Sequence, residues 1–93
     1  MVFAYPAIFK QNHDASYEGR FPDLPGLSVN GPTLDHAINN AIDLLRGVIY
    51  AELTEEEDPS LPKVSHIDDL PLEEGEEARL ISCSIHLDMG WSD

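Results

Sequence analysis

The sequence is poor in cysteine, in basic residues and in long apolar runs. Cys83 is the one cysteine in 93 residues, so no internal disulfide can form, which suits a reducing compartment. No run of about 18 apolar residues is present, and no basic segment leads into an apolar stretch, so neither a membrane span nor a secretory signal is expected. The sequence predicts a soluble, cytoplasmic protein whose residues 1–93 form a single domain.

Basic residues are outnumbered by acidic ones. Five Lys or Arg stand against 18 Asp or Glu, which gives a net charge of −13. Such a chain repels phosphate backbones, so we expect no direct nucleic-acid binding by this chain alone. Eleven acids lie between residues 52 and 77, where Lys63 is the only base. They are Glu52, Glu55, Glu56, Glu57, Asp58, Asp68, Asp69, Glu73, Glu74, Glu76 and Glu77. This segment is either a solvated surface or one that meets a basic protein.

Three short strands are predicted in the first third of the chain. Aromatic or small residues recur at every second position over residues 3–9 and again over residues 17–21, which is the period of a strand. Leu27 and Val29 flank Ser28 in the third stretch. Pro6 cannot donate a hydrogen bond, so the first strand has either an unpaired side at this residue or a bulge. Gly19, on the apolar side of the second strand, is expected to leave room for a helix. Residues 22–26 reverse the chain between the second and third strands.

An amphipathic helix is predicted to follow. Thr33 is placed as its N-cap, and Asp35 lies in the first turn, where a carboxylate favours the helix dipole. Apolar residues recur at spacings of three and four from Leu34 to Ile49. The wider apolar arc, which adds Ile42, Leu44 and Leu53, is covered either by another partner or by the acidic segment that follows.

Residues 54–78 form a long acidic arm with three prolines, in which Ser65 and Asp68 resemble a capping box for a short turn at residues 66–70. A fourth strand is predicted from the alternation of Ile81, Cys83, Ile85 and Leu87 with polar residues. With the helix as a crossover, this strand is expected to run parallel to the first. The predicted fold is α+β, a two-layer β-β-β-α-β sandwich with strand order 3-2-1-4. The face of the sheet away from the helix is expected to carry Ala4, Ile8, Glu18, Arg20, Ser28, Ser82, Ser84 and His86.

Several stretches resemble the HicB family of antitoxins. They are YPAIF (5–9), FPDLPG (21–26), GPTLDHAINNA (31–41) and LEEGEEARLISCSIHLD (72–88). The resemblance covers nearly the whole chain, and it implies a truncated ribonuclease H-like fold of order β-β-β-α-β. It also implies that the protein binds and inhibits HicA, a small basic toxin that cleaves messenger RNA. Many HicB proteins continue into a DNA-binding segment, whereas this sequence stops at Asp93, and the family's Pro-x-Pro-Ser is replaced here by Leu61-Pro62-Lys63-Val64-Ser65.

Catalysis is not expected. Two-metal hydrolysis of the ribonuclease H type needs converging carboxylates, yet the first strand has none, and Glu18, Asp23 and Asp88 form no evident cluster. His13, His36, His66 and His86 show no metal-ligand spacing, so no metal or cofactor is predicted. Cys83, on the buried face of its strand, is expected to be an inert thiol. Trp91 either anchors a partner or closes the open end of the core.

Three functions follow from these observations, and the first is preferred. The chain is a HicA-inhibiting antitoxin, an oligomeric domain of the same family without a toxin, or a metal-dependent nuclease that uses Glu18 or Asp88. A free strand edge and the wide apolar arc favour a homo-dimer or tetramer. The residues predicted to bind the partner are Glu55, Glu56, Glu57, Asp58, Glu73, Glu74, Glu76, Glu77 and Trp91.

Overall fold

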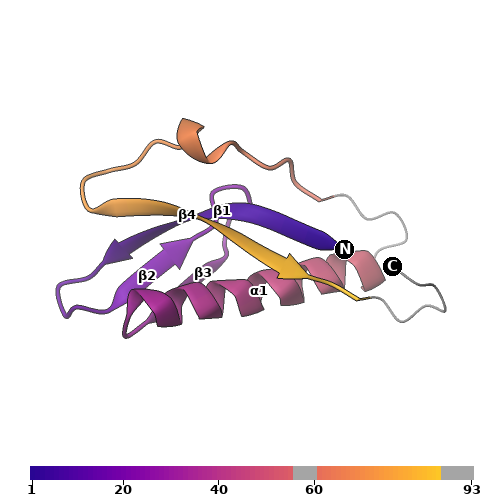
Figure 1. Ribbon diagram of the computed structural model, residues 1–93, viewed down its shortest axis with the longest axis horizontal. Coiled ribbons are helices and arrows are strands. Elements are labelled where there is room, and N and C mark those ends of the chain that lie inside the picture. Colours follow the sequence, from indigo (N-terminus) through magenta and orange to yellow (C-terminus); the bar gives the residue numbers. More distant parts are fainter. Residues whose placement is uncertain (56–60, 87–93) are drawn as a thin grey trace.

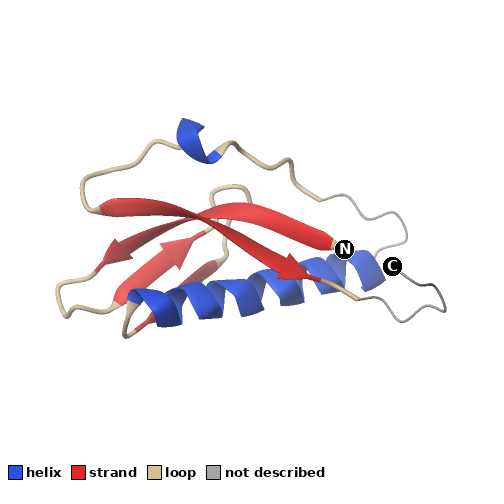
Figure 2. Ribbon diagram, in the orientation of Figure 1, coloured by secondary structure: helices blue, strands red, loops and turns tan. Residues whose placement is uncertain are grey.

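A computed structural model describes residues 1–55 and 61–86 of the protein. Three strands, β1 (Val2–Gln11), β2 (Tyr17–Arg20) and β3 (Ser28–Gly31), precede the helix α1 (Leu34–Glu55). A 3₁₀ turn, η1 (Ile67–Asp69), and the strand β4 (Glu76–Ser84) follow (Figure 1). The strands form one sheet of order β3-β2-β1-β4, and α1 forms a second layer against it (Figure 2). The α+β class, the order of elements and the strand order are therefore confirmed. No helix in the described residues is long and apolar enough to cross a membrane.

The predicted direction of the last strand is wrong. β4 pairs antiparallel with β1, in a register that runs from Val2 opposite Ser84 to Lys10 opposite Glu76. The reason is the path of residues 61–75, which we name the return segment. It leads back along the length of the sheet after α1, on the side of the sheet away from the helix in Figure 1. The chain thus re-enters the sheet at the end where α1 began, and β4 runs opposite to β1.

The core lies between α1 and one face of the sheet. Ala37, Ala41, Leu45 and Ile49 are all 0% exposed, and they lie three or four residues apart on a single stripe of the helix. The sheet contributes Tyr5, Ala7, Phe9, Ile81 and Cys83, whose side chains alternate toward the helix along β1 and β4. Ile42, Leu44 and Leu53, from the wider apolar arc, are partly buried against this core together with Leu61 of the return segment.

Pro6 lies where β1 has a partner on only one side. Pairing of β1 with β2 begins at Ile8 opposite Arg20, whereas pairing with β4 continues past Pro6, which is opposite Leu80. The register with β4 has no inserted residue, so the strand contains no bulge in this stretch. Of the two predicted alternatives, the unpaired side is confirmed.

The glycine that allows the helix to approach is Gly31 and not Gly19. A Cβ atom built at Gly19 would lie 2.5 Å from the Phe9 ring, so a side chain of the neighbouring strand fills the space expected for the helix. A Cβ atom at Gly31 would lie 2.7 Å from the backbone nitrogen of Ala37 in the first turn of α1. This close contact fixes how the chain turns from β3 into the helix.

The predicted N-cap of α1 is confirmed. The Thr33 hydroxyl accepts a hydrogen bond from the His36 amide at 3.1 Å, and the Thr33 carbonyl accepts one from Ala37 at 3.0 Å. These bonds satisfy donors that the first turn of a helix leaves free.

Replacing Gly31 with alanine is expected to destabilise the fold, by about 1 to 3 kcal/mol, because backbone atoms must move to admit the methyl group. The matched control is Gly47→Ala in the exposed middle of α1, where a Cβ would meet nothing within 4 Å. That change is expected to stabilise the protein by about 0.4 to 1 kcal/mol. Urea unfolding of both variants measures the difference, and a neutral Gly31→Ala variant would contradict the close approach.

Candidate functional site

The return segment is attached to the sheet by the loop between β2 and β3. In this loop Phe21 and Leu24 are buried, and Asp23 lies between them in sequence. The Asp23 carboxylate accepts two hydrogen bonds from Ser65, one from its amide at 2.7 Å and one from its hydroxyl at 2.5 Å. The Tyr5 hydroxyl donates to the Pro62 carbonyl at 2.5 Å, and burial, followed by the charge of Asp23, raises the pKa of this phenol. The FPDLPG motif therefore holds the start of the return segment.

The predicted short turn at residues 66–70 is present as η1, but its predicted cap is wrong. His66 is the N-cap, and its Nδ1 accepts a hydrogen bond from the Asp68 amide at 3.2 Å. The Ser65 hydroxyl instead donates a hydrogen bond to the Asp23 carboxylate.

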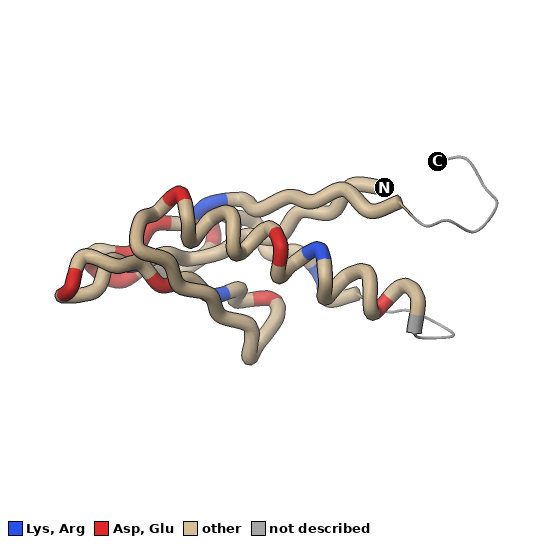
Figure 3. Tube along the Cα trace, turned by 90° about the horizontal axis from the view of Figure 1, so that it is seen from below, with Lys and Arg blue, Asp and Glu red and all other residues tan. Residues whose placement is uncertain are grey.

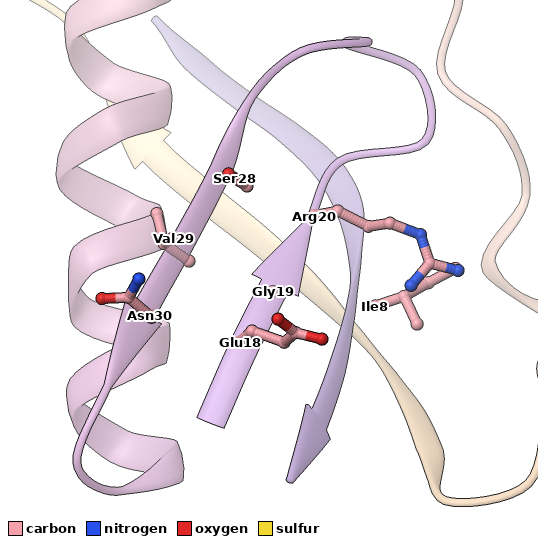
Figure 4. A pocket seen from close by; sticks show the side chains of 7 residues that line it. All are labelled: Ile8, Glu18, Gly19, Arg20, Ser28, Val29 and Asn30. Atoms are coloured by element: carbon pink, nitrogen blue, oxygen red, sulfur yellow. The ribbon is translucent and has the colours of Figure 1, made fainter. Parts of the chain in front are cut away.

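A second attachment lies at the far end of the return segment. Arg20 on β2 donates to the Glu76 carboxylate at 2.7 Å and so reaches past β1 to the first residue of β4. The other oxygen of Glu76 accepts the Glu73 amide at 2.8 Å. The Arg20 hydrogen bond, followed by that of Glu73, lowers the pKa of the Glu76 carboxyl. Ile8 lies beside the Arg20 side chain (Figure 4) and is only 3% exposed, although it points away from α1.

A polar hollow of about 240 Å³ lies next to this pair, on β2 and β3. Glu18 and Arg20 from β2 and Ser28 and Asn30 from β3 line it (Figure 4). The Glu18 carboxylate is exposed and has no hydrogen-bond partner within the part of the chain that the structure describes. The hollow thus presents a free carboxylate, a hydroxyl and an amide, which are groups suited to polar side chains of a protein partner.

Acidic side chains gather at one end of the molecule. β1 ends there at the turn that contains Asp14, Lys10 is opposite both Glu18 and Glu76, and α1 begins there with Asp35 in its first turn. We name this region the acidic end (Figure 3). It comprises Asp14, Glu18, Asp35, Glu73, Glu74, Glu76 and Glu77. Its seven acids are accompanied by the cations Lys10, Arg20 and Arg79, of which Arg20 and Arg79 are ion-paired with Glu76 and Glu77.

The residues predicted to bind a partner fall into three groups. Glu73, Glu74 and Glu77 are exposed at the acidic end, whereas Glu76 is enclosed by Arg20, with 4% of its side chain exposed. Glu55 is the last residue of α1, and this end of the helix lies far from the acidic end along the molecule (Figure 1). Glu56, Glu57, Asp58 and Trp91 lie outside the described residues. The structure therefore separates acids that are close in sequence.

Sequence reasoning missed three members of the acidic end. Asp14, Glu18 and Asp35 lie outside the acid-rich stretch 52–77, and they join it only because the chain returns to the end where α1 starts. The feature that could have identified these three residues is the antiparallel direction of β4, because it places the acidic first residues of β4 beside the end of β1.

Groups suited to catalysis are dispersed in the described residues. They contain no cluster of three or more His, Cys, Asp or Glu side chains arranged to hold a metal ion. Asp23 bonds Ser65, Glu18 lies in the polar hollow, and Asp88 lies outside the described residues. Burial raises the pKa of the Cys83 thiol, which disfavours the reactive thiolate.

A small sheet-and-helix domain that exposes an acidic end and a polar hollow has the features of a protein-binding module. Residues 5–91 match the model of the HicB-like antitoxins of bacterial toxin-antitoxin systems, and the chain belongs to this family. The predicted resemblance is thereby confirmed, and membership of an antitoxin family implies a toxin partner in general. No curated protein matches the chain.

Replacing Ser65 with alanine is expected to loosen the return segment, because Asp23 loses one of its two hydrogen bonds. A bond to a charged group contributes about 1.5 kcal/mol or more, so amides of residues 61–70 should exchange with solvent about tenfold faster or more. Hydrogen exchange measures this, with Ser82→Ala as the control on exposed β4. Equal protection in both variants would contradict the attachment.

Lowering the pH is expected to reduce the free energy of unfolding of the protein, partly through protonation of Glu76. Because the pKa of this carboxyl is lowered in the folded state, its contribution is present above the ordinary value of 4.5 and is lost as the pH falls through the folded pKa. Glu76→Gln removes this contribution, so its unfolding midpoint should depend less on pH in that range than that of the wild type. Urea unfolding at a series of acidic pH values tests this, and Glu74→Gln, at an exposed position, should retain the wild-type slope.

Proposed function

We propose that the protein inhibits a small, basic HicA-type toxin that cleaves messenger RNA, by occupying the toxin surface that binds RNA. Membership of the antitoxin family supports a toxin partner in general, and the acidic end supports a basic one. A surface that binds RNA carries positive charge, because it must neutralise phosphates. The same charge would attract the acidic end at long range and speed the encounter.

The exposed carboxylates of Glu73, Glu74 and Glu77 are proposed to lead this contact, together with Glu18 at the polar hollow. They project from separate elements, β2 and the turn into β4, which Arg20 and Glu76 hold together. A surface already fixed by such contacts loses little conformational freedom on binding. Glu55, Glu56, Glu57, Asp58 and Trp91 complete the proposed contact set, and Glu76 is assigned the supporting role that its ion pair implies.

The observation that carries this proposal is the concentration of acids at one end of a chain with net charge −13, where only Glu76 and Glu77 of the seven are ion-paired within the described residues. We also propose that the chain is a homo-oligomer, because β4 lies at the edge of the sheet. A family member that oligomerises and regulates without any toxin is the second candidate, and the free edge is the observation that favours it.

The likeness to ribonuclease H is proposed to extend only to the order of the elements, since β4 runs antiparallel to β1.

The test is binding to the small basic protein encoded by the neighbouring gene. The double variant Glu73→Gln/Glu74→Gln should slow association by roughly tenfold at low salt, because steering depends on the acidic end. Asp68→Asn/Asp69→Asn changes the charge equally on η1 and should have a smaller effect. Raising the salt concentration in steps should progressively weaken the wild-type complex, because salt screens the attraction between opposite charges. Failure of the wild type to bind, in low or high salt, would contradict the proposal and favour the toxin-free candidate.

A further inference from the structure

The polar hollow lies on the face of the sheet that is turned away from α1. Val29 packs against the core beneath the helix, so its neighbours on β3, Ser28 and Asn30, belong to the opposite face. Glu18 is opposite Asn30 in the register, and Arg20 is opposite Ser28, so the four residues share this outer face. They line the hollow of about 240 Å³, which is open to solvent (Figure 4). Two charged and two neutral polar residues thus surround one small space.

The positive charge of Arg20 is already used on the side away from β3. Its side chain extends toward Ile8 on β1 (Figure 4), and its Nη1 donates to the Glu76 carboxylate at 2.7 Å. The hydrogen bond and charge of Glu76, followed by the charges of Glu73 and Glu18, raise the pKa of the Arg20 guanidinium. One guanidinium is therefore near three carboxylates, and only Glu76 among them is bonded to it within the described part of the chain. The hollow keeps an excess of negative charge.

The carboxylate of Glu18 supplies this excess charge. It accepts no hydrogen bond from residues 1–55 or 61–86, and Lys10, which is opposite it in the register with β1, forms no ion pair with it there. Both of its oxygens are free for a donor from outside the chain. A carboxylate makes its strongest hydrogen bonds with cationic donors, because the charges add to the bond. The hollow is therefore suited to a positively charged group.

Other occupants fit this hollow less well. Its volume is below the range of about 300 to 1,000 Å³ that is typical of pockets for small-molecule ligands, so it has room for a single side chain. One carboxylate lines it, and the described residues contain no cluster of three or more His, Cys, Asp or Glu arranged to hold a metal ion. A phosphate would meet the charge of Glu18, while Arg20 is already neutralised by Glu76.

We propose that the hollow binds the side chain of an arginine from the phosphate-binding surface of the basic partner, an inference that rests on the proposed function. A guanidinium has five N–H donors in one plane and binds a carboxylate with two of them. It can therefore bond Glu18 and still donate to the Ser28 hydroxyl and the Asn30 amide oxygen. A lysine ammonium is a compact charge that holds its water more strongly, so it loses more on entering the hollow.

This contact gives the inhibition a direct physical cause. A guanidinium that is bonded to Glu18 cannot hold a phosphate at the same time, so the hollow would compete with RNA for the same group. Its effect differs from that of the other exposed acids. Glu73 and Glu74 attract the partner at long range and act on the association rate, whereas a short-range contact with an arginine acts on the dissociation rate.

Dissociation of the complex with the basic protein of the neighbouring gene tests the contact. Ser28→Leu fills the hollow without changing the charge, and it should raise the dissociation rate by roughly tenfold or more, with little effect on the association rate. Its control is Ser82→Leu, at an exposed position of β4 outside the hollow. Glu18→Gln should also raise the dissociation rate, whereas Asp68→Asn, the same loss of charge on η1, should leave that rate unchanged.

The hollow itself is tested without any partner protein, by titrating the whole chain with N-acetyl-arginine amide or N-acetyl-lysine amide. The arginine compound should shift the amide NMR signals of Gly19 and Val29, with a dissociation constant in the millimolar range, as expected for a fragment of this size. The lysine compound should shift them less at equal concentration. Both shifts should be lost in Glu18→Gln and in Ser28→Leu. The dispersion of the other signals shows that each variant is folded.

Two results would overturn the inference. One is a complex that forms with the wild type and dissociates at the same rate from Ser28→Leu and Glu18→Gln, in which case the proposed function stands and the hollow has no part in it. The other is equal shifts by the two amides, spread over the acidic end, which would indicate attraction by charge alone. If the wild type forms no complex, the proposed function fails, and the titration alone decides whether the hollow is an arginine site.

Discussion

The structure depends on the path of the chain after α1. A helix that ended next to β1 and led directly into β4 would have given a parallel strand. Instead the return segment carries the chain back over the sheet, and partly buried hydrogen bonds attach it at Tyr5 and Asp23. Each of these bonds links a residue of the first quarter of the chain to one beyond residue 60, so they form only when the sheet and its loop are already in place. The antiparallel sheet, the position of the acidic residues and the free edge of β4 all follow from this path.

The periodicity of apolar residues was sufficient to predict the strands and the helix. The alternation of aromatic residues predicted β1, and the spacing of three and four from Leu34 to Ile49 predicted α1 and the buried stripe that the structure contains. Thr33 was recognisable as a cap because its effect is local. The direction of β4 was not recognisable, because it depends on where a long proline-containing segment runs, and that is decided by contacts over more than 40 residues, such as Asp23 with Ser65.

The same distinction between local and distant contacts explains the errors at single residues. Ser65 has the spacing of a capping residue, yet the carboxylate of Asp23 offers its hydroxyl a charged partner, which is stronger than a neutral cap. Gly19 was correctly placed on the apolar face, but the Phe9 ring on the adjacent strand fills the space above it. For the candidate site, composition identified the acidic character, whereas Asp14, Glu18 and Asp35 became part of it only through the pairing of β1 with β2 and the position of the helix start.

The orientation of α1 bears on how one carboxylate is tolerated among so many like charges. The first turn of the helix lies at the acidic end, with Asp35 beside the amides of the helix start, where Thr33 is the cap. Those amides carry a partial positive charge equivalent to about half an elementary charge, which offsets the charge of the carboxylate nearest to them. The main chain thus supplies a fixed counter-charge for the acid that the helix itself adds to this surface.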